Sequence, residues 1–351
     1  MENKAITDLF NHPVSWLSNT GPDEDIAISS RIRLARNFSG IAFPTNASDS
    51  ERNHILSVAS SSIKSKNILK NPVAFNINLL SEVDKQFLLE RHLISSDFCK
   101  NKIASSLIIN KKETYSIMIN EEDHFRLQVL NPGLSLKTIW PSINEIDEKL
   151  SQDIPFAFDN VLGYLTSCPT NIGTGIRASV MLNLPALTIS GYINGVIQGV
   201  NKLGLAVRGI YGEGSASLGN LYQVSNQSTL GESELQIIER LENIIHQIII
   251  HEKNARLKLL EIRRNFILDC IGRAYGTLRY AYLLSSKEAL NSLSVLRMGV
   301  DLKMFESLNI HSINELFIAI QPAHLQKYAG KELTSPERDI LRAEMVKKKL
   351  Q

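Results

Sequence analysis

The sequence of 351 residues has few cysteines and no long apolar run. The most apolar stretches, such as residues 244–250, contain polar residues and fall far short of the ~20 residues that a membrane-spanning helix needs, so no membrane span is expected. The first residues, MENKAITDLFNHP, lack the apolar core and cleavage site of a secretory signal. Three widely spaced cysteines, Cys99, Cys168 and Cys270, argue against a disulfide framework or a cysteine zinc site. A reducing cytoplasm fits this composition best.

Net charge is also nearly absent. The chain has 38 Lys and Arg against 36 Asp and Glu, a formal charge of +2, so nothing draws it as a whole toward nucleic acid or an anionic membrane. Direct nucleic-acid binding and membrane association are therefore not expected. At ~150 residues per domain the length suggests about two domains.

The first two thirds of the chain carry strand patterns. Residues 25–35 alternate apolar and polar side chains, as a half-buried strand does. The segments 106–110, 114–120 and 125–130 are separated by short polar turns, which predicts an antiparallel meander. Strand character returns at 205–211 and 221–226, on either side of the glycine-rich turn GEGSASLG.

Two capping-box patterns predict helices within this part. Ser142 with Glu145 predicts a helix running to about residue 151, and Thr229 with Glu232 predicts the start of a long amphipathic helix.

After about residue 256 only helical patterns remain. They cover 263–284, 286–296, 312–320 and 335–349, and the last has Ser335 as a candidate N-cap and Pro336 at its first position. The loss of strands predicts two domains, a catalytic domain over residues 1–258 and an all-helical domain over 259–351.

Arginines supply the first candidate site. The sequence has no P-loop and no full dinucleotide fingerprint, so any phosphate must be held by side chains. Arg31 and Arg33 lie two apart on one strand face, and further arginines occupy strand or loop positions at Arg126, Arg177 and Arg208. Several planar guanidinium groups on one face suit a polyanion, although each arginine alone fits a surface ion pair equally well.

Three other segments contain reactive groups. They are the acidic cluster NEEDH at 120–124, the loop of small residues around Cys168, and the turn that holds Glu213. Taken singly, each fits a plain structural reading: a solvated hairpin turn, a packed thiol and a flexible turn.

Taken in order, SSRIRLARN, NEEDHFR, CPTNIGTGIRAS and RGIYGEGS resemble the motifs of the phosphagen (guanidino) kinase superfamily, over roughly residues 26–233. The resemblance implies an α+β fold class: a phosphagen-kinase-like catalytic domain, with an antiparallel sheet flanked by helices, followed by the C-terminal all-helical domain. It also implies that ATP and Mg²⁺ are the cofactors, with no metal held by the protein itself.

Carried over position by position, the resemblance assigns roles to eight residues. Glu122 and Glu213 match the glutamates that bind a guanidinium group, and Cys168 matches the reactive cysteine. The nucleotide-phosphate-binding arginines match Arg31, Arg33, Arg126, Arg177 and Arg208. The chemistry agrees, because phosphoryl transfer depends on positioning and charge neutralisation, and carboxylates can hold a guanidinium and take its proton.

The departures from the superfamily pattern concern substrate size. Only 28 residues precede Ser29, whereas kinases of free guanidines carry a helical domain there that closes over the small substrate. An open pocket would admit an arginine side chain within a polypeptide, and the layout resembles the bacterial protein-arginine kinases of the superfamily. The predicted function is therefore ATP-dependent phosphorylation of arginine side chains in proteins. The alternatives are a kinase of free arginine or another small guanidine and, from another class, an inactive phosphoarginine-binding adaptor.

The sequence RDILRA in the last helical segment resembles a phosphoarginine-binding signature, R-D-x-x-R-A, of the same protein-arginine kinases. Arg338 and Arg342 lie four apart on one helix face, where their guanidinium groups can converge on a phosphate, and Asp339 can accept from the guanidino group of the ligand. A solvated helix surface explains the same spacing.

The remaining expectations concern partners. The helical segments are rich in Leu and Ile, which predicts a homodimer through the helical domain. The protein substrates are expected to expose arginine. The resemblance further implies a part in protein quality control and stress response, with a zinc-binding activator protein, a heat-shock repressor and a Clp-type protease as partners.

Overall fold

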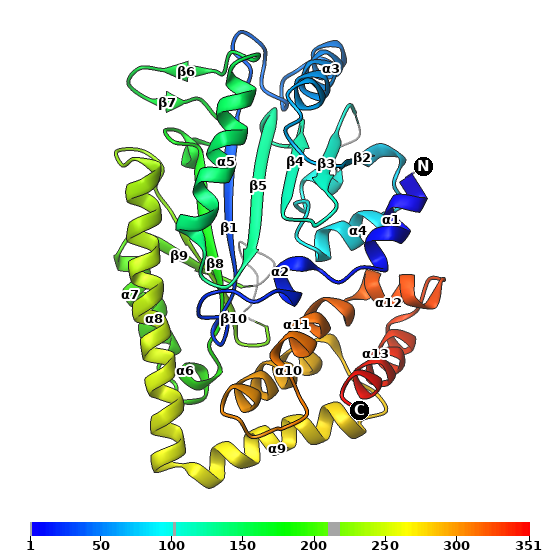
Figure 1. Ribbon diagram of the computed structural model, residues 1–351, viewed down its shortest axis with the longest axis vertical. Helices are drawn as coiled ribbons and strands as arrows, with labels where there is room; N and C mark the ends of the chain where they lie inside the picture. The colour runs from blue at the N-terminus through cyan, green and yellow to red at the C-terminus, as the bar shows by residue number, and fades with distance from the viewer. Residues whose placement is uncertain (1, 101–102, 210–217) are drawn as a thin grey trace.

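The computed structural model describes residues 2–100, 103–209 and 218–351 (Figure 1). Within these ranges the fold is built on an antiparallel eight-stranded sheet in the order β2-β3-β4-β5-β1-β8-β10-β9, with a separate short hairpin β6-β7. The strands are β1 (Ala27–Arg36), β2 (Pro72–Asn76), β3 (Ser106–Asn110), β4 (Tyr115–Ile119), β5 (Phe125–Pro132), β6 (Phe158–Asp159), β7 (Gly163–Tyr164), β8 (Ile176–Asn183), β9 (Leu205–Arg208) and β10 (Leu221–Asn226).

The predicted meander is confirmed, since β3, β4 and β5 are consecutive neighbours in the sheet. The sequence patterns did not predict β8, which lies between β1 and β10 and is buried at all but one position. Its residues alternate apolar and polar side chains except at Met181, so the pattern of a half-buried strand is present there in the sequence.

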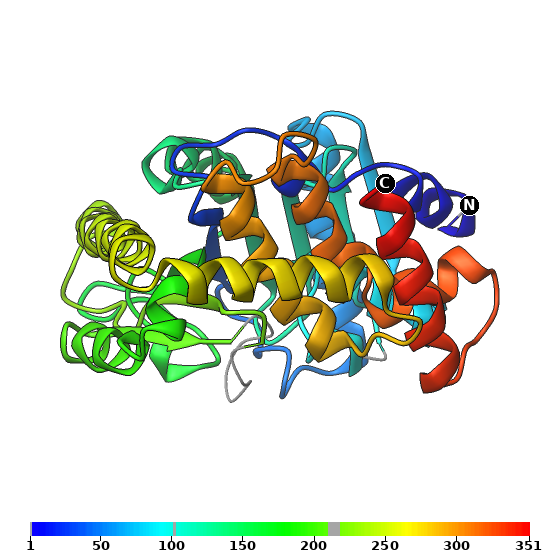
Figure 2. The same ribbon diagram turned by 90° about the horizontal axis from the view of Figure 1, so that it is seen from below.

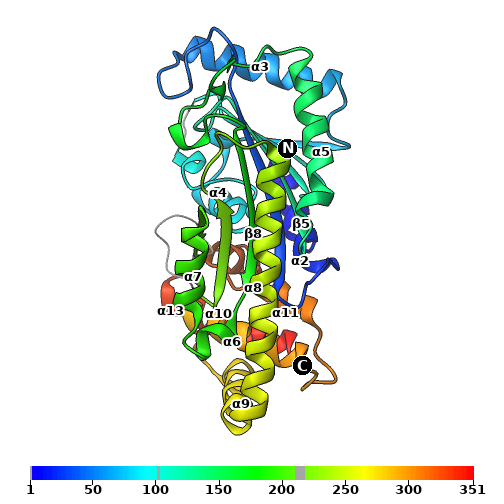
Figure 3. The same cartoon turned by 90° about the vertical axis from the view of Figure 1, so that its left-hand side faces the viewer.

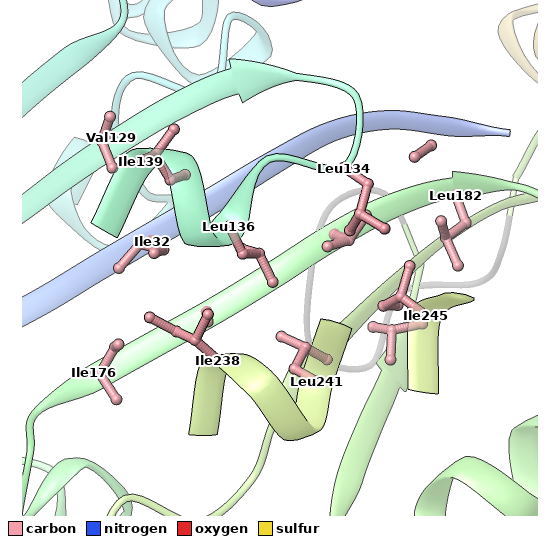
Figure 4. Close-up of a cluster of buried hydrophobic side chains, with 14 of the residues drawn as sticks. Ile32, Val129, Leu134, Leu136, Ile139, Ile176, Leu182, Ile238, Leu241 and Ile245 are labelled. Carbon is pink, nitrogen blue, oxygen red and sulfur yellow. The ribbon is translucent and has the colours of Figure 1, made fainter. Parts of the chain in front are cut away.

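Helices α5 (Leu136–Ser151) and α8 (Glu234–Ile262) cover one face of the sheet. Figure 4 shows Ile238 and Leu241 of α8 facing Ile176 of β8, in the same apolar layer as Ile32 of β1. Because side chains alternate along a strand, this layer takes the even-numbered residues of β1, and Arg31 and Arg33 project from the opposite face. Figure 3 shows α8 extending past the end of the sheet to α9.

Both predicted capping boxes are wrong. Helix α5 begins six residues before Ser142, whose hydroxyl donates to the carbonyl of Ile139 instead. Helix α8 begins with Ser233 as its N-cap, in a capping box with Gln236. The Thr229 hydroxyl lies within hydrogen-bonding distance of the carbonyls of Thr170 and Ile172, so tertiary contacts override the local pattern there.

The C-terminal part is helical, as expected. Its buried side chains form a core with Trp16, Ile28, Leu130 and Met181 of the sheet-containing part, so the helices pack directly below the sheet (Figures 1 and 2). The expected boundary at residue 258 falls inside α8, and the chain turns at Arg263. The helices are α9 (Arg264–Tyr280), α10 (Ser286–Asp301), α11 (Ile310–Ala319), α12 (Pro322–Ala329) and α13 (Ser335–Lys349).

Helix α13 matches its predicted range, but its N-cap is Thr334, in a capping box with Glu337, and not Ser335. The remaining helices are α1 (Glu2–Phe10), α2 (Ser15–Ser18), α3 (Asp49–Ser65), α4 (Glu82–Glu90), α6 (Pro185–Ile189) and α7 (Ile193–Lys202), with 3₁₀ turns at Ile77–Leu79, Phe98–Lys100 and Pro169–Asn171. No helix in the described ranges is long and apolar enough to span a membrane.

Candidate active site

Arginine side chains gather on the face of the sheet opposite α5 and α8. In the antiparallel register Arg33 lies directly opposite Arg177 of β8, and Arg31 lies opposite Ser179 of the same strand. Arg126 of β5 lies opposite Ala35, which is two residues after Arg33 on β1 and therefore on the same face. Arg208 ends β9, across from Gln223 of β10. The five expected arginines therefore come from four strands and share one face of the sheet.

The guanidinium groups are close enough to repel one another. Burial, together with the charges of Arg126 and Arg177, lowers the pKa of Arg31 to about 9. Burial and the same two neighbours plus Arg31 lower the pKa of Arg33 well below its ordinary value, and only Glu121 opposes the shift. The Nε of Arg33 is also buried and has no hydrogen-bond partner among the described residues. Such crowding costs stability, and a bound polyanion would offset it.

The acidic loop at 120–124 is a built structure and not the solvated turn that its sequence suggests by itself. Asn120, Glu121, Asp123 and His124 are buried, and Glu122 alone is exposed. Glu121 pairs with Arg126 at 2.5 Å. Partial burial of the carboxyl, followed by the charges of Asp123 and Glu121, raises the pKa of Glu122. The loop thus presents one carboxylate with increased proton affinity.

Asn37, directly after β1, holds this loop. Its side-chain nitrogen donates to Asp123 at 2.6 Å, and its side-chain oxygen accepts from the backbone N–H of His124 at 2.8 Å. The backbone N–H of Phe38 donates to Nδ1 of His124 at 2.9 Å, and burial lowers the pKa of His124 to about 4, so the ring is neutral. These contacts tie the acidic loop to the end of the arginine-bearing strand.

Ser167 joins the acidic loop to the loop that contains Cys168. Its backbone N–H donates to Oδ1 of Asp123 at 2.7 Å, and its hydroxyl donates to the carbonyl of Glu122 at 2.7 Å. Cys168 follows directly, with its Sγ 3.0 Å from the hydroxyl of Thr170. Glu122 and Cys168, far apart in the sequence, are thereby carried by neighbouring loops. Glu213, the other expected carboxylate, lies outside the described residues.

His92 belongs to the same face although the sequence gave no sign of it. It lines a small pocket with Arg31, Trp16 and Gln223, and burial followed by the charge of Arg31 lowers its pKa to about 3. A neutral imidazole therefore lies beside the arginine group. His92 follows α4 in a loop with no recognisable motif, so only the fold brings it to Arg31.

The three residues expected to bind phosphoarginine, Arg338, Asp339 and Arg342, lie in the first turns of α13. Arg342 is buried, and its guanidinium donates to the carbonyls of Ile320 at 2.9 Å and Leu284 at 2.7 Å and to the carboxylate of Asp339 at 2.5 Å. Two nitrogens of its guanidinium, Nε and Nη1, thus make these contacts within the protein. Arg338 and Asp339 are partly exposed. Arg338 donates to the carbonyl of Leu333 at 2.7 Å.

A larger apolar groove lies elsewhere, between α7 and α8, with a volume of about 550 Å³. Val196, Val200 and Ile248 are among its lining residues, and none of the candidate site residues is. The candidate site is therefore separate from this groove.

Comparison with known proteins identifies the class. Residues 54–255 match the family model described as ATP:guanido phosphotransferase, C-terminal catalytic domain. The structure superposes on that of lombricine kinase with a TM-score of 0.58 and 25% identity, covering 70% of each chain. The duplicated taurocyamine kinase of Schistosoma mansoni, with bound transition state analog components, also gives 0.58 and 25%, over 69% of this chain and 35% of that one. The fold is that of an ATP:guanido phosphotransferase, and the chain belongs to this family.

The helical part narrows the assignment. Residues 264–351 match the Protein-arginine kinase McsB C-terminal domain. The chain is 45% identical to a protein-arginine kinase of Halothermothrix orenii over 99% of both chains, and 44% identical to one of Pelotomaculum thermopropionicum over 98% of this chain and 97% of that one. This chain belongs to the protein-arginine kinase family, and the predicted fold class and enzymatic activity are confirmed.

Proposed function

We propose that the arginine face binds the phosphates of ATP during protein-arginine phosphorylation, through Arg31, Arg33, Arg126, Arg177 and Arg208, and that His92, which lies beside Arg31, also contacts the nucleotide. The observation that carries the proposal is the crowding of buried guanidinium groups on one face: burial, followed by the charges of the neighbouring arginines, lowers the pKa of Arg31 and Arg33. A triphosphate would neutralise these charges and be aligned by them, and preorganised charge of this kind is the main source of catalysis in phosphoryl transfer.

For the acceptor we propose that Glu122, Glu213 and Cys168 hold the guanidinium of a substrate arginine. The bond between the γ-phosphorus and its bridging oxygen breaks as a nitrogen-phosphorus bond forms, ADP leaves, and the attacking nitrogen loses a proton to Glu122. The raised pKa of Glu122 supports the last role, because a carboxylate with higher proton affinity is a better base. The contacts of Ser167 with both loops support a shared pocket.

We further propose that Mg²⁺ reaches the site with ATP, because it keeps several water ligands and binds substrate phosphates in preference to a cage of protein side chains. In the part of the chain that the structure describes, no group of three or more His, Cys, Asp or Glu side chains could hold a metal ion.

The variant Glu122→Gln tests the acceptor clamp. It should bind ADP like the wild type and transfer phosphate about 10²–10³-fold more slowly, as for other lost electrostatic partners of a transition state. Glu145→Gln, which changes an exposed carboxylate of α5 paired with Lys149, is the matched control and should keep full activity. The product is measured by mass spectrometry of an unfolded protein incubated with Mg-ATP, without acid. Near wild-type turnover of Glu122→Gln contradicts the assignment.

A second proposal assigns phosphoarginine binding to Arg338 and Asp339, with Arg342 as a positioning residue. The ion pair of Arg342 with Asp339 fixes the carboxylate that would accept from the ligand's guanidino group, while Arg338 would bind its phosphate. Calorimetry on the full chain should show loss of phosphoarginine binding in Arg338→Ala and Asp339→Ala. Lys348→Ala, an exposed change in the same helix, should bind normally. Equal affinity in all variants leaves only a solvated helix surface.

We also propose a homodimer through the helical domain, because Tyr280, Tyr282, Leu283 and Ile340 are exposed there. Light scattering that gives a monomer at micromolar concentration contradicts it. From the sequence resemblance come the further proposals of a cytoplasmic role in protein quality control and stress response. The proposed partners are the zinc-binding activator, the heat-shock repressor and the Clp-type protease.

A further inference from the structure

Glu90, the last residue of α4, is a buried carboxylate that binds the N-terminus of α12. Its two oxygens accept from the backbone N–H groups of Ala323 at 2.9 Å and His324 at 3.2 Å, and the ring Nδ1 of His324 donates to it at 2.7 Å. Both Glu90 and His324 are buried. The helix dipole and three N–H donors make this a strong site for a carboxylate. The contact joins the C-terminal helices to the sheet-containing part.

The chain passes from this contact directly to the nucleotide face. Arg91, the next residue, is buried in an ion pair with Glu113. His92 then adopts a left-handed backbone conformation with φ of 59°. Its carbonyl accepts from the side chain of Gln128 at 2.8 Å, and its ring lies edge-on to Trp16 with 5.3 Å between centroids.

A left-handed conformation is unfavourable for a residue with a side chain, and it persists where neighbouring contacts impose it. Here it closes the end of α4: the backbone N–H of His92 donates to the carbonyl of Leu89 at 2.9 Å, and that of Leu93 donates to the carbonyl of Leu88 at 3.0 Å. Gln128 holds the carbonyl of His92, and Glu90 fixes the same end of α4 against α12. The place of the His92 ring beside Arg31 therefore follows from the position of the end of α4, which contacts a helix of the C-terminal part.

We infer that Glu90 is a positioning residue for the nucleotide site: by binding the N-terminus of α12 it fixes the end of α4, and with it His92 beside Arg31. The inference rests on the proposed function, in which Arg31 and His92 contact ATP. Docking of the C-terminal helices then sets the affinity for ATP, apart from any role of those helices in binding substrate.

The test compares variants of the full chain in steady-state kinetics. Glu90→Gln keeps the shape of the side chain but removes the charge that the N–H groups of α12 contact. We expect the KM for ATP to rise about 3- to 10-fold, the effect of one lost hydrogen-bonding contact. The kcat at saturating ATP and the KM for the protein substrate should stay unchanged. A purely structural role would lower the melting temperature without this selective rise.

Asp84→Asn is the matched control. Asp84 pairs with Lys327, so it also joins α4 to α12, but at the other end of α4 from His92. The KM for ATP of this variant should equal that of the wild type. An equal rise in Asp84→Asn and Glu90→Gln overturns the inference, because helix docking in general would then account for the effect.

The variant His92→Ala tests separately whether His92 contacts ATP, which is the proposed function on which the role of Glu90 rests. If His92→Ala leaves the KM for ATP unchanged, the proposed nucleotide contact is wrong. If His92→Ala raises it and folded Glu90→Gln does not, the positioning role is wrong. Should Glu90→Gln fail to fold, His324→Ala keeps the carboxylate and removes one donor. It should raise the KM for ATP about two-fold, and an unchanged KM overturns the inference.

Discussion

Two arginines of the same strand should respond in opposite ways to the same substitution. Arg36 projects toward the covered face of the sheet, where it is fully buried and pairs with Asp147 at 2.8 Å. Its guanidinium also donates to the carbonyls of Ala35 and Thr174 and lies 3.5 Å from the centre of the Tyr164 ring. Arg36→Met leaves the buried carboxylate of Asp147 unpaired.

Breaking a buried ion pair by removing one partner costs about 3–5 kcal/mol of unfolding free energy. At about 2.1 cal/mol/K of unfolding entropy per residue, each kcal/mol corresponds to roughly 1.4 °C for a chain of 351 residues, so the melting temperature of Arg36→Met should fall by roughly 4–7 °C.

Arg33→Met should behave differently, because burial and three neighbouring arginines depress the pKa of Arg33. A depressed pKa in a cation means that the folded state disfavours the charge, so removing the charge leaves the stability unchanged or increases it. The affinity for ADP should meanwhile fall at least about ten-fold, as for a lost hydrogen bond to a charged group. Differential scanning calorimetry and ADP titration measure both quantities. If Arg33→Met melts as low as Arg36→Met, or binds ADP normally, the division of the strand into structural and phosphate-binding arginines is wrong.

Two further predictions concern acid sensitivity and the last helix. Asp123→Asn should move the acid limb of the pH profile of kcat/KM to lower pH, because it removes a charge that raises the pKa of Glu122. The Oδ1 atom of the new side chain can still accept hydrogen bonds from Asn37 and Ser167, so the loop is kept in place. An acid limb at the wild-type pH would mean that another group controls it. Arg342→Met should lower the free energy of unfolding by about 3 kcal/mol, since it leaves the carbonyls of Leu284 and Ile320 without this donor, whereas Arg338→Ala should cost less than about 1 kcal/mol. Denaturant titration that gives equal losses would place Arg342 at the surface.

Local patterns located several strands closely. The segments predicted at 106–110 and 221–226 match β3 and β10 to the residue. Strand β8, which follows the loop of small residues around Cys168, was not predicted although most of its residues alternate apolar and polar, and α12 was not predicted either. The capping boxes predicted at Ser142 and Thr229 do not form, because each hydroxyl donates to a backbone carbonyl instead: that of Ile139 for Ser142 and that of Ile172 for Thr229.

The candidate site could also be predicted only in part from the sequence. Arg31 and Arg33 could be placed on one face from their spacing alone, and the register then brought Arg177 opposite Arg33. His92 could not be found, because its place depends on the end of α4. The burial of Arg342 could not be predicted either. Helical spacing indicates which residues share a face of a helix, but it does not indicate which face is covered by α11.

The central claim is that this kinase acts on arginine within polypeptides. The most direct test is competition in one reaction, with free arginine and an unfolded arginine-containing protein sharing the same enzyme and Mg-ATP, and both products quantified without acid. We predict a higher kcat/KM for the polypeptide, because binding energy from the chain around the arginine helps to orient the attacking nitrogen. A higher kcat/KM for free arginine would contradict the account.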